Sequence, residues 1–457
     1  MHQLSMDAGN HPNNNKVGIF PDGTKDDVIT STCDAKVVND SKKVPKRYFW
    51  SGGLGLILAL ANSCFFYCAW PQQHIFLVPN AWHEFMTTAA IGFVGLFAGS
   101  LVLNFEVWMN IKEIKTWRNF WFLYLFCSVA WILSNVGYYQ IYYVMLGLHP
   151  PMPLNIHVCG ILTYAAALSI LWFIIPSSVR NADETFWKRY GFYVLAQTFR
   201  YVAVLEYFAC TWGFYKLGID YQWIVALILP IIREVNALIL GELCYRSGGS
   251  KDAAIKVTAT HEMACRHAIF LSVAVSLLVT VQTAFICFIL DFLVGLILCM
   301  KIIWRAKRKG HSISVEYDTD LHELVFNGKT VYIIPLTYFF CFLVAWFGPN
   351  YYILGSVGNA SWHWGKVQYL SPPILIMLAM FAIELMGIVV YALLLKFLIK
   401  ISYFDSYMHM QKKYWFIMAV HEAYALNEVR ISTCLNIFYL QYVICPLKSI
   451  NLSFFLL

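Results

Sequence analysis

The chain has 457 residues, of which 59% are hydrophobic and only 13% are charged. Soluble domains carry about 25% charged residues, so the composition excludes an ordinary water-soluble protein and predicts an all-α, polytopic transmembrane helical bundle. The net charge of +7 does not indicate nucleic-acid binding, because the basic residues gather in short loops between apolar runs, where they face anionic lipid.

Residues 1–47 form a polar N-terminal segment without an apolar core long enough for a cleavable signal peptide. This composition predicts a disordered cytoplasmic tail. The first apolar run, at 48–70, is then expected to act as an uncleaved signal anchor at the start of a transmembrane domain that extends over 48–400.

The apolar runs of this domain are long enough to cross a bilayer, which takes about 20 helical residues. They occupy residues 48–70, 83–109, 119–146, 156–178, 191–215, 221–245, 267–300, 331–354 and 368–400. As one helix, the run at 267–300 would be roughly 50 Å long, against about 30 Å of hydrocarbon. Two crossings with a fold-back near Gln282 and Thr283 give ten spans, the arrangement we favour, whereas one long tilted helix gives nine.

Basic residues gather in every second loop, as the positive-inside rule requires. They include Lys42, Lys43, Lys46, Arg47, Lys112, Lys115, Arg118, Arg180, Lys188, Arg189, Arg246, Lys251, Lys256 and Arg266. The alternation predicts a cytoplasmic N-terminus in a multi-pass protein of either the plasma membrane or an endomembrane. With ten spans, the loop at about 301–330 is also cytoplasmic. The sequon at Asn359 then lies on the opposite side, which makes Asn359 a glycosylation candidate.

Two segments near the C-terminal half have less regular patterns. Polar and apolar residues alternate around Asn327-Gly328, which predicts a small β-hairpin. Residues 401–457 are expected to form an interfacial amphipathic helix followed by a poorly defined apolar stretch. Residues 433–457 either add a membrane segment or belong to an incomplete product.

The run at 221–245 contains two adjacent charges, Arg233 and Glu234, near its middle. On a helix, both share one stripe with Pro230, Ala237 and Gly241. Asn236 flanks this stripe. Because an intramembrane charge costs about 2.5–3.5 kcal/mol on insertion scales, the stripe is expected to face protein or water.

Candidate partners lie on the preceding span, which carries Arg200 and Glu206. The loop between the two spans is short, so we expect an antiparallel hairpin. By depth, Glu206 would pair with Arg233 and Arg200 with Glu234. Such a network has two interpretations: it locks two helices together, or it lines the path of a solute or ion.

Glu384 is the deepest and most isolated acidic residue, since its own helix has no basic residue before Lys396. Such a carboxyl is suited to proton or cation coupling, although it could instead be hydrogen-bonded inside the bundle. Two further acidic residues, Glu106 and Asp291, are embedded in apolar runs. We expect Glu106 to lie near the inner interface, and the depth of Asp291 depends on the fold-back.

The stretch His261-Glu262-Met263-Ala264-Cys265-Arg266-His267 places His261 and Cys265 on one helix face, but a second ligand histidine is missing from the HExxH pattern. We therefore interpret it as the start of an interfacial helix and not as a metal site. The sequence contains no nucleotide-binding loop, no dinucleotide fingerprint and no nucleophile elbow. We expect no cofactor and no metal, and an enzyme is not favoured.

The sequence thus predicts a solute or ion transporter, or a channel. Its polar path would be formed by Arg200, Glu206, Arg233, Glu234, Asn236 and Glu384, with Glu384 as the coupling carboxyl. The expected partners are the lipid bilayer and an unidentified small solute or ion, without nucleic acid. The alternatives are a multi-pass receptor or sensor for a small ligand, and a structural membrane protein.

Overall fold

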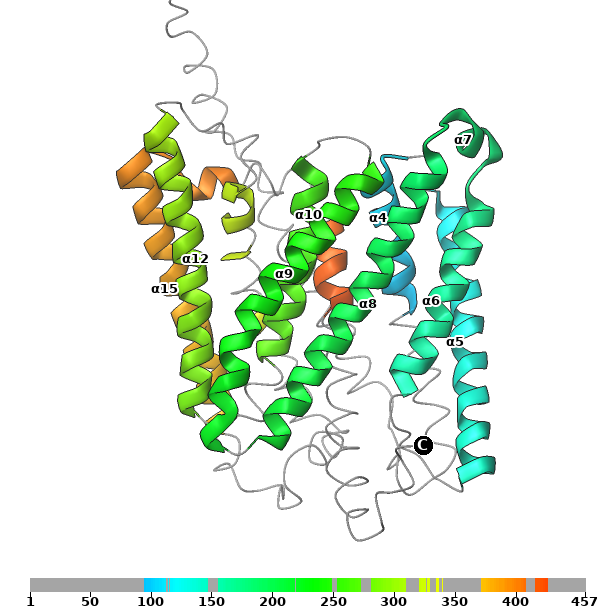
Figure 1. The fold of residues 1–457 in the computed structure, drawn as a ribbon, viewed down its shortest axis with the longest axis horizontal. Coiled ribbons are helices and arrows are strands. Elements are labelled where there is room, and N and C mark those ends of the chain that lie inside the picture. The colour runs from blue at the N-terminus through cyan, green and yellow to red at the C-terminus, as the bar shows by residue number, and fades with distance from the viewer. Residues whose placement is uncertain are drawn as a thin grey trace, which may run out of the picture. The chain divides into compact units, whose positions relative to one another are not determined.

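The computed structural model describes the part of the chain between residues 94 and 425, with gaps. The described residues are 94–111, 114, 116–146, 155–217, 219–248, 253–272, 281–309, 320–325, 327–328, 334–336, 339, 371–407 and 416–425. Every regular element in these ranges is helical (Figure 1), which confirms the all-α prediction for this part. The predictions for the N-terminal tail, the run at 48–70, Asn359 and residues 426–457 lie outside the described residues.

The long helices follow the predicted apolar runs. They are α4 (Gly95–Met109), α5 (Trp117–Leu146), α6 (Asn155–Ile174), α8 (Phe186–Lys216), α9 (Gln222–Gly248), α10 (Ala253–Phe270), α12 (Val281–Lys309) and α15 (Ser371–Ile399). Two short elements, α7 (Ser177–Ala182) and the 3-10 turn η4 (Ile219–Tyr221), precede α8 and α9 respectively. Residues 416–425 form a further helix, called here the 416–425 helix.

Four of these helices are long and apolar enough to cross a membrane. They contain the stretches Trp117–Ile141, Gln222–Gly248, Gln282–Arg308 and Leu375–Ile399, with mean hydropathies between 1.6 and 2.6. Shorter apolar helices lie at Gly95–Met109 and Val158–Ile174. These stretches indicate a multi-pass membrane protein. The total of nine or ten spans includes runs that lie outside the described residues, so it stays a prediction.

Each of these four helices exposes large apolar side chains on its outer face. Leu133 on α5 is 66% exposed, Leu238 on α9 63%, Ile297 on α12 68% and Leu375 on α15 64%. Soluble proteins rarely expose contiguous apolar patches of this kind. Hydrocarbon chains are a suitable environment for them, so these faces contact the lipid bilayer.

Helices α8 and α9 form the expected hairpin and lie side by side (Figure 1). The η4 turn joins them within a few residues. Helix α9 then packs against α10 and α12, and α12 packs against α15. Helix α9 is therefore in contact with both the α8 and the α12 side of the bundle.

At the opposite end of α8, Arg189 ties three segments together. Its guanidinium donates to the Ser247 carbonyl oxygen (2.9 Å), to the Met109 carbonyl and to Asp183 (2.7 Å). The Thr185 hydroxyl and backbone N–H also donate to Asp183, at 2.7 and 2.8 Å. These hydrogen bonds, followed by the charge of Arg189, lower the pKa of Asp183.

The predicted apolar run at 267–300 is divided between two helices, because α10 ends at Phe270 and α12 begins at Val281. Residues 273–280 between them lie outside the described ranges. Gln282 and Thr283 lie in the first turn of α12, directly after these residues, so one crossing or two over this run, with a fold-back near them, stays a prediction.

The interpretation of α10 as an interfacial helix is also wrong. Its described side chains from Val257 to Phe270 are all buried, and the helix packs against α4, α8 and α9. The reason is that its charged residues find partners inside the bundle, as the next subsection describes, so the helix does not need water on one face.

The β-hairpin expected around Asn327-Gly328 is replaced by helix. Residues 320–325 and 327–328 are helical. Leu321, Leu324 and Val325 are buried together against α12 and α15, and their spacing of three and four residues is that of a helix. Packing on two neighbouring helices therefore outweighs the local turn signal.

The 416–425 helix falls in the region where we expected an interfacial helix. Residues 417–425 are all buried. Ile417, Met418 and Val420 pack with Leu103 of α4 and Val257 of α10. Tyr424 belongs to the apolar cluster of α4, α5 and α6. The helix is thus a part of the interior.

Candidate functional site

Two groups of buried charges occupy the interior. The first, called the Arg200 cluster, consists of Arg200, Glu262, Arg266, His421 and Glu422, with their polar neighbours. Arg200 on α8 is 2% exposed and pairs with Glu262 of α10, not with Glu234. Its guanidinium also donates to Gln197 and to the Ser100 hydroxyl of α4 (2.8 Å).

Glu262 connects α10 to the 416–425 helix. The Arg266 guanidinium donates to Glu262 Oε1 at 3.1 Å. Glu262 Oε2 lies 4.0 Å from His421 Nε2, and this same ring nitrogen lies 2.7 Å from Asn104 Oδ1 of α4. Three helices therefore meet at one buried carboxylate.

The two His-Glu dipeptides of this cluster are paired crosswise. Glu262 faces His421, while His261 Nε2 lies 3.7 Å from Glu422 Oε1. His261 also lies 3.5 Å from Cys265 Sγ, the neighbour that its spacing predicts. Within the described residues, no three His, Cys, Asp or Glu side chains converge as a metal site would require.

Aromatic rings complete the surroundings of the two guanidinium groups. The carbon of each guanidinium lies over the Tyr424 ring, at 5.5 Å for Arg200 and 5.6 Å for Arg266, within range of a cation–π interaction. With neutral histidines, two arginines balance Glu262 and Glu422. The Arg200 cluster is thus an enclosed and electrically balanced network, which fits the interpretation that it locks helices together.

The second group, called the Arg233 cluster, consists of Arg233, Glu234, His267, Asp291 and Glu384. Arg233 on α9 is 5% exposed. It pairs with Asp291 of α12, and its Nε and Nη2 donate to Glu234 Oε1 at 3.1 and 3.0 Å. The expected stripe on α9 is confirmed for Pro230, Ala237 and Gly241, which are buried with Arg233.

Both pairs that we expected across the α8–α9 hairpin are wrong. Glu206 accepts a hydrogen bond from Asn236 Nδ2 at 2.7 Å, while Arg233 and Arg200 take their carboxylates from α12 and α10. Arg200 and Glu206 point to different sides of α8. Matching depth on two neighbouring helices therefore does not decide the pairing when a third helix supplies a carboxylate.

His267 extends the Arg233 cluster towards α8. Its Nε2 lies 3.7 Å from Asp291 Oδ1, and its Nδ1 lies 3.4 Å from the Tyr207 hydroxyl. His267 is 2% exposed. Because Glu262 and Arg266 also lie on α10, this helix contributes side chains to both the Arg200 cluster and the Arg233 cluster.

A cavity of about 350 Å³ opens beside the Arg233 cluster. Its polar lining consists of Arg233, Glu234, Asp291, Lys301, Asn327, Glu384 and Tyr391, and its apolar lining includes Val294, Ile297, Leu298, Leu324 and Ile388. Three of the six residues that the sequence assigned to a polar path line this cavity. Arg200, Glu206 and Asn236 are not among its lining residues.

Glu384 is the least satisfied polar group on this cavity. Its side chain is 7% exposed, and its Oε1 is buried without a hydrogen-bond partner. Asp291 lines the same cavity as Glu384. The other cation on the cavity, Lys301, is already paired with Asp320 at 3.2 Å, and Arg305 binds the same carboxylate at 2.8 Å.

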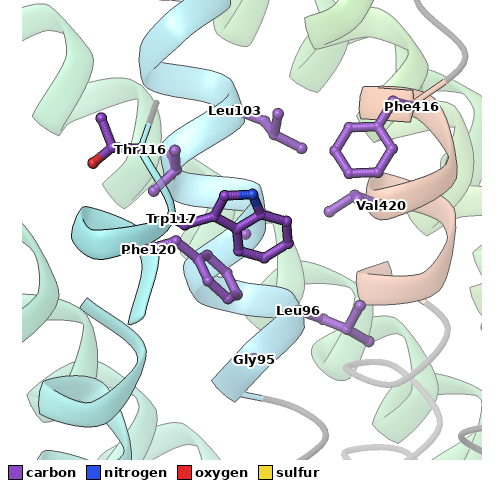
Figure 2. Close-up of a pocket in the computed structure, with 10 residues that line it drawn as sticks. Gly95, Leu96, Leu103, Thr116, Trp117, Phe120, Phe416 and Val420 are labelled. Atoms are coloured by element: carbon purple, nitrogen blue, oxygen red, sulfur yellow. The ribbon is translucent and has the colours of Figure 1, made fainter. Parts of the chain in front are cut away.

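A second hollow of about 390 Å³ has a different character, because its lining has no charged residue. It lies between α4, the start of α5 and the 416–425 helix. Figure 2 shows Trp117 and Phe120 on one side and Phe416 and Val420 on the other. Among its lining residues only Thr116 and Trp117 have polar side-chain atoms, whereas the cavity of the Arg233 cluster has several charged groups to orient a polar solute, so that cavity is the candidate functional site.

Sequence reasoning missed several of the residues that complete the two clusters. Asp291 was visible as an embedded acid, but its partner was not. Glu262, Arg266, His267 and His421 lie in segments that were expected at the interface. The sequence of these segments alternates polar and apolar faces. A helix at a membrane surface and a helix that packs beside buried charges have this same pattern, so the pattern could not distinguish them.

The comparisons with known proteins leave the assignment to the geometry: no protein-family model, no curated protein and no solved structure matches this chain.

Proposed function

We propose that this multi-pass membrane protein transports or conducts a small solute or ion through the cavity beside the Arg233 cluster. The observation that carries the proposal is a polar cavity, lined by Arg233, Glu234, Asp291 and Glu384, between helices that are apolar enough to span a membrane. Ionisable residues at such depth are costly and usually mark a solute or proton path.

The size and lining of the cavity suit a small polar occupant. About 350 Å³ is enough for several water molecules or one small solute. Charged groups stand on the α9, α12 and α15 sides, and the remaining lining is largely apolar. This arrangement resembles the usual ligand site, in which a few polar groups orient the solute and apolar walls exclude bulk water.

The Arg200 cluster has a supporting part in this proposal. It is fully enclosed, its charges are balanced, and it joins α4, α8, α10 and the 416–425 helix. Such a network keeps one side of the bundle rigid while the α9, α12 and α15 side binds the solute.

A flux assay tests the proposal. The purified protein is reconstituted in liposomes, and uptake of radiolabelled Na⁺, Rb⁺, Cl⁻ and a panel of amino acids, sugars and organic acids is compared with protein-free liposomes. Uptake of at least one probe should exceed the background. It should fall by about tenfold or more in Glu234→Gln and Glu384→Gln, because each substitution removes an ionisable carboxyl from the cavity.

The matched control is Glu242→Gln. Glu242 lies on α9 but is exposed, and its contact is an i,i+4 pair with Arg246 at 2.7 Å, so its flux should equal that of the wild type. Full flux in both cavity variants would reject the site. No flux of any probe under any gradient would reject transport and favour a receptor or sensor for a small ligand.

A further inference from the structure

The cavity beside the Arg233 cluster is one end of a line of buried titratable groups. Tyr207 on α8 contacts His267 on α10 at 3.4 Å, and His267 lies 3.7 Å from Asp291 on α12. Asp291 and Glu384 of α15 line the cavity together. Four helices each contribute one titratable side chain, and all four side chains are buried.

The charges around this line leave Glu384 unmatched. Arg233 faces two carboxylates, Asp291 and Glu234, whereas Lys301 and Arg305 share the single carboxylate of Asp320. Among the described residues, no basic group lies within ion-pair distance of Glu384.

An ionised Glu384 would therefore be an extra negative charge inside the bundle. A buried carboxylate without a counter-ion is strongly disfavoured relative to the neutral acid. Protonation removes this charge, and the neutral acid can then donate a hydrogen bond to Asp291. Two carboxyl groups that share one buried cavity can hold one proton between them and titrate as a pair.

We propose that the Glu384–Asp291 carboxyl pair binds and releases the proton that accompanies transport through this cavity, with His267 and Tyr207 as its relay. This inference rests on the proposed transport function and adds the identity of the coupling ion. The groups that face the pair are Tyr207, Arg233, Glu234, His267, Lys301, Asn327 and Tyr391.

Each proton step changes one O–H or N–H bond at a time. Hydronium in the cavity gives its proton to the Glu384 carboxylate and becomes water. For transfer to the relay, the proton leaves the carboxyl pair, which keeps the negative charge, and binds Nε2 of a neutral His267; the Nδ1–H of the resulting imidazolium donates to the Tyr207 oxygen, which keeps its own proton, until water in the cavity takes the proton from Nε2 and becomes hydronium. The 3.7 Å separation at Nε2 is longer than a hydrogen bond, so one water molecule or a side-chain rotation completes this step.

A proton fits this site better than a metal cation does. A metal cation has to replace its hydration shell with several oxygen ligands. Within the described part of the chain, no three acidic, histidine or cysteine side chains converge in that way. A proton requires only the two carboxyl groups.

Infrared spectroscopy tests proton binding directly, without a transport assay. Difference spectra of the protein in lipid are recorded between acidic and alkaline pH, and the C=O stretching band of a protonated carboxyl is followed. The band should titrate in the wild type and in the exposed control Glu242→Gln. The part of the band that comes from the Glu384 carboxyl should be missing from Glu384→Gln, whose spectrum keeps only the contribution of the other acidic residues, and should return in Glu384→Asp.

The flux arm uses the same proteins in liposomes with an imposed pH gradient and a trapped pH-sensitive dye. Glu384→Gln should lower proton uptake by about tenfold or more, and Glu384→Asp should retain a measurable part of it. An unchanged band and unchanged proton uptake in Glu384→Gln would overturn the proposal. Loss of the wild-type band on adding Na⁺ at constant pH would overturn it as well, since the site would then bind a metal cation.

A second variant covers the case in which Glu384→Gln fails to fold, and the infrared band distinguishes failure of the proton site from failure of the transport function. If Glu384→Gln does not fold, Asp291→Asn removes the partner instead and should shift the pH at which the carboxyl band titrates; no shift would contradict the pair. A band that titrates in the wild type and loses the Glu384 contribution in Glu384→Gln, in a protein without flux of any probe, would support the proton site and reject the proposed transport function.

Discussion

At the scale of single residues, the buried arginines show how this chain accommodates charge without water. Each guanidinium has several donors, and the interior supplies acceptors from more than one helix to Arg200 and to Arg233. Arg200 binds Glu262, Gln197 and Ser100, and Arg233 binds Asp291 and Glu234. A buried ion pair contributes little net stability compared with an apolar pair, but the loss of one partner leaves a charge that nothing compensates.

This asymmetry predicts the effect of Arg200→Met. The substitution leaves Glu262 with Arg266 and His421 but removes its closest partner. It should lower the free energy of unfolding by about 3–5 kcal/mol, measured as thermal or denaturant unfolding in detergent. The control Arg246→Met removes an exposed pair with Glu242 and should cost less than about 1 kcal/mol. Equal costs for the two variants would contradict the role of the Arg200 cluster.

At the scale of the elements, α12 and α15 approach each other where a glycine makes room for an aromatic ring. A Cβ added at Gly295 of α12 would overlap the Tyr391 side chain of α15, whose hydroxyl donates to the Phe292 carbonyl oxygen at 2.8 Å. Gly295 and Tyr391 both line the cavity. The packing of these two helices therefore also fixes one wall of the candidate site.

Gly295→Ala should consequently force Tyr391 out of its position and break its hydrogen bond. Overpacking of this kind costs about 1–3 kcal/mol, which thermal unfolding in detergent would measure. Gly137→Ala is the matched control, because a Cβ at Gly137 of α5 meets nothing within 4 Å. That variant should be as stable as the wild type or slightly more so. If Gly295→Ala is equally harmless, the close α12–α15 contact does not exist.

At the scale of the whole molecule, the apolar exposed faces and the basic loops determine how the chain lies in a bilayer. The protein should remain in the membrane pellet after alkaline carbonate extraction, because four of its helices are apolar over at least 25 residues.

The ten-span arrangement adds a topological prediction. A cysteine introduced as Gly310→Cys, in a background without other reactive cysteines, should be labelled only from the cytoplasmic side. Labelling only from outside would reject ten spans.

Much of the fold could be predicted from the sequence, because hydrophobic length and charge patterning act locally. The long apolar runs predicted α5, α6, α8, α9 and α15 to within a few residues at most ends, although α8 begins five residues earlier than expected. The stripe on α9 identified Arg233, since a charge in an apolar helix has to turn inward. Glu384 was identified for the same reason.

The partners of these charges could not be predicted, because they come from helices that are distant in the sequence. Asp291 follows Arg233 by 58 positions and His421 follows Asn104 by 317. Depth along a neighbouring helix suggested Glu206 and Glu234 instead, and this was wrong. Nor could the pattern of α10 separate a helix at the membrane surface from one enclosed by α4, α8 and α9.

The sequence by itself determined that this protein contains long apolar helices and that embedded charges such as Arg233 and Glu384 are buried within the bundle. The cost of an exposed backbone and of an exposed charge in hydrocarbon imposes both features on each segment separately. Only the tertiary structure decided which carboxylate meets which arginine, and that Glu384 remains without a basic partner among the described residues beside a polar cavity. That choice depends on how several helices pack around α10 at once, and no local pattern contains this information.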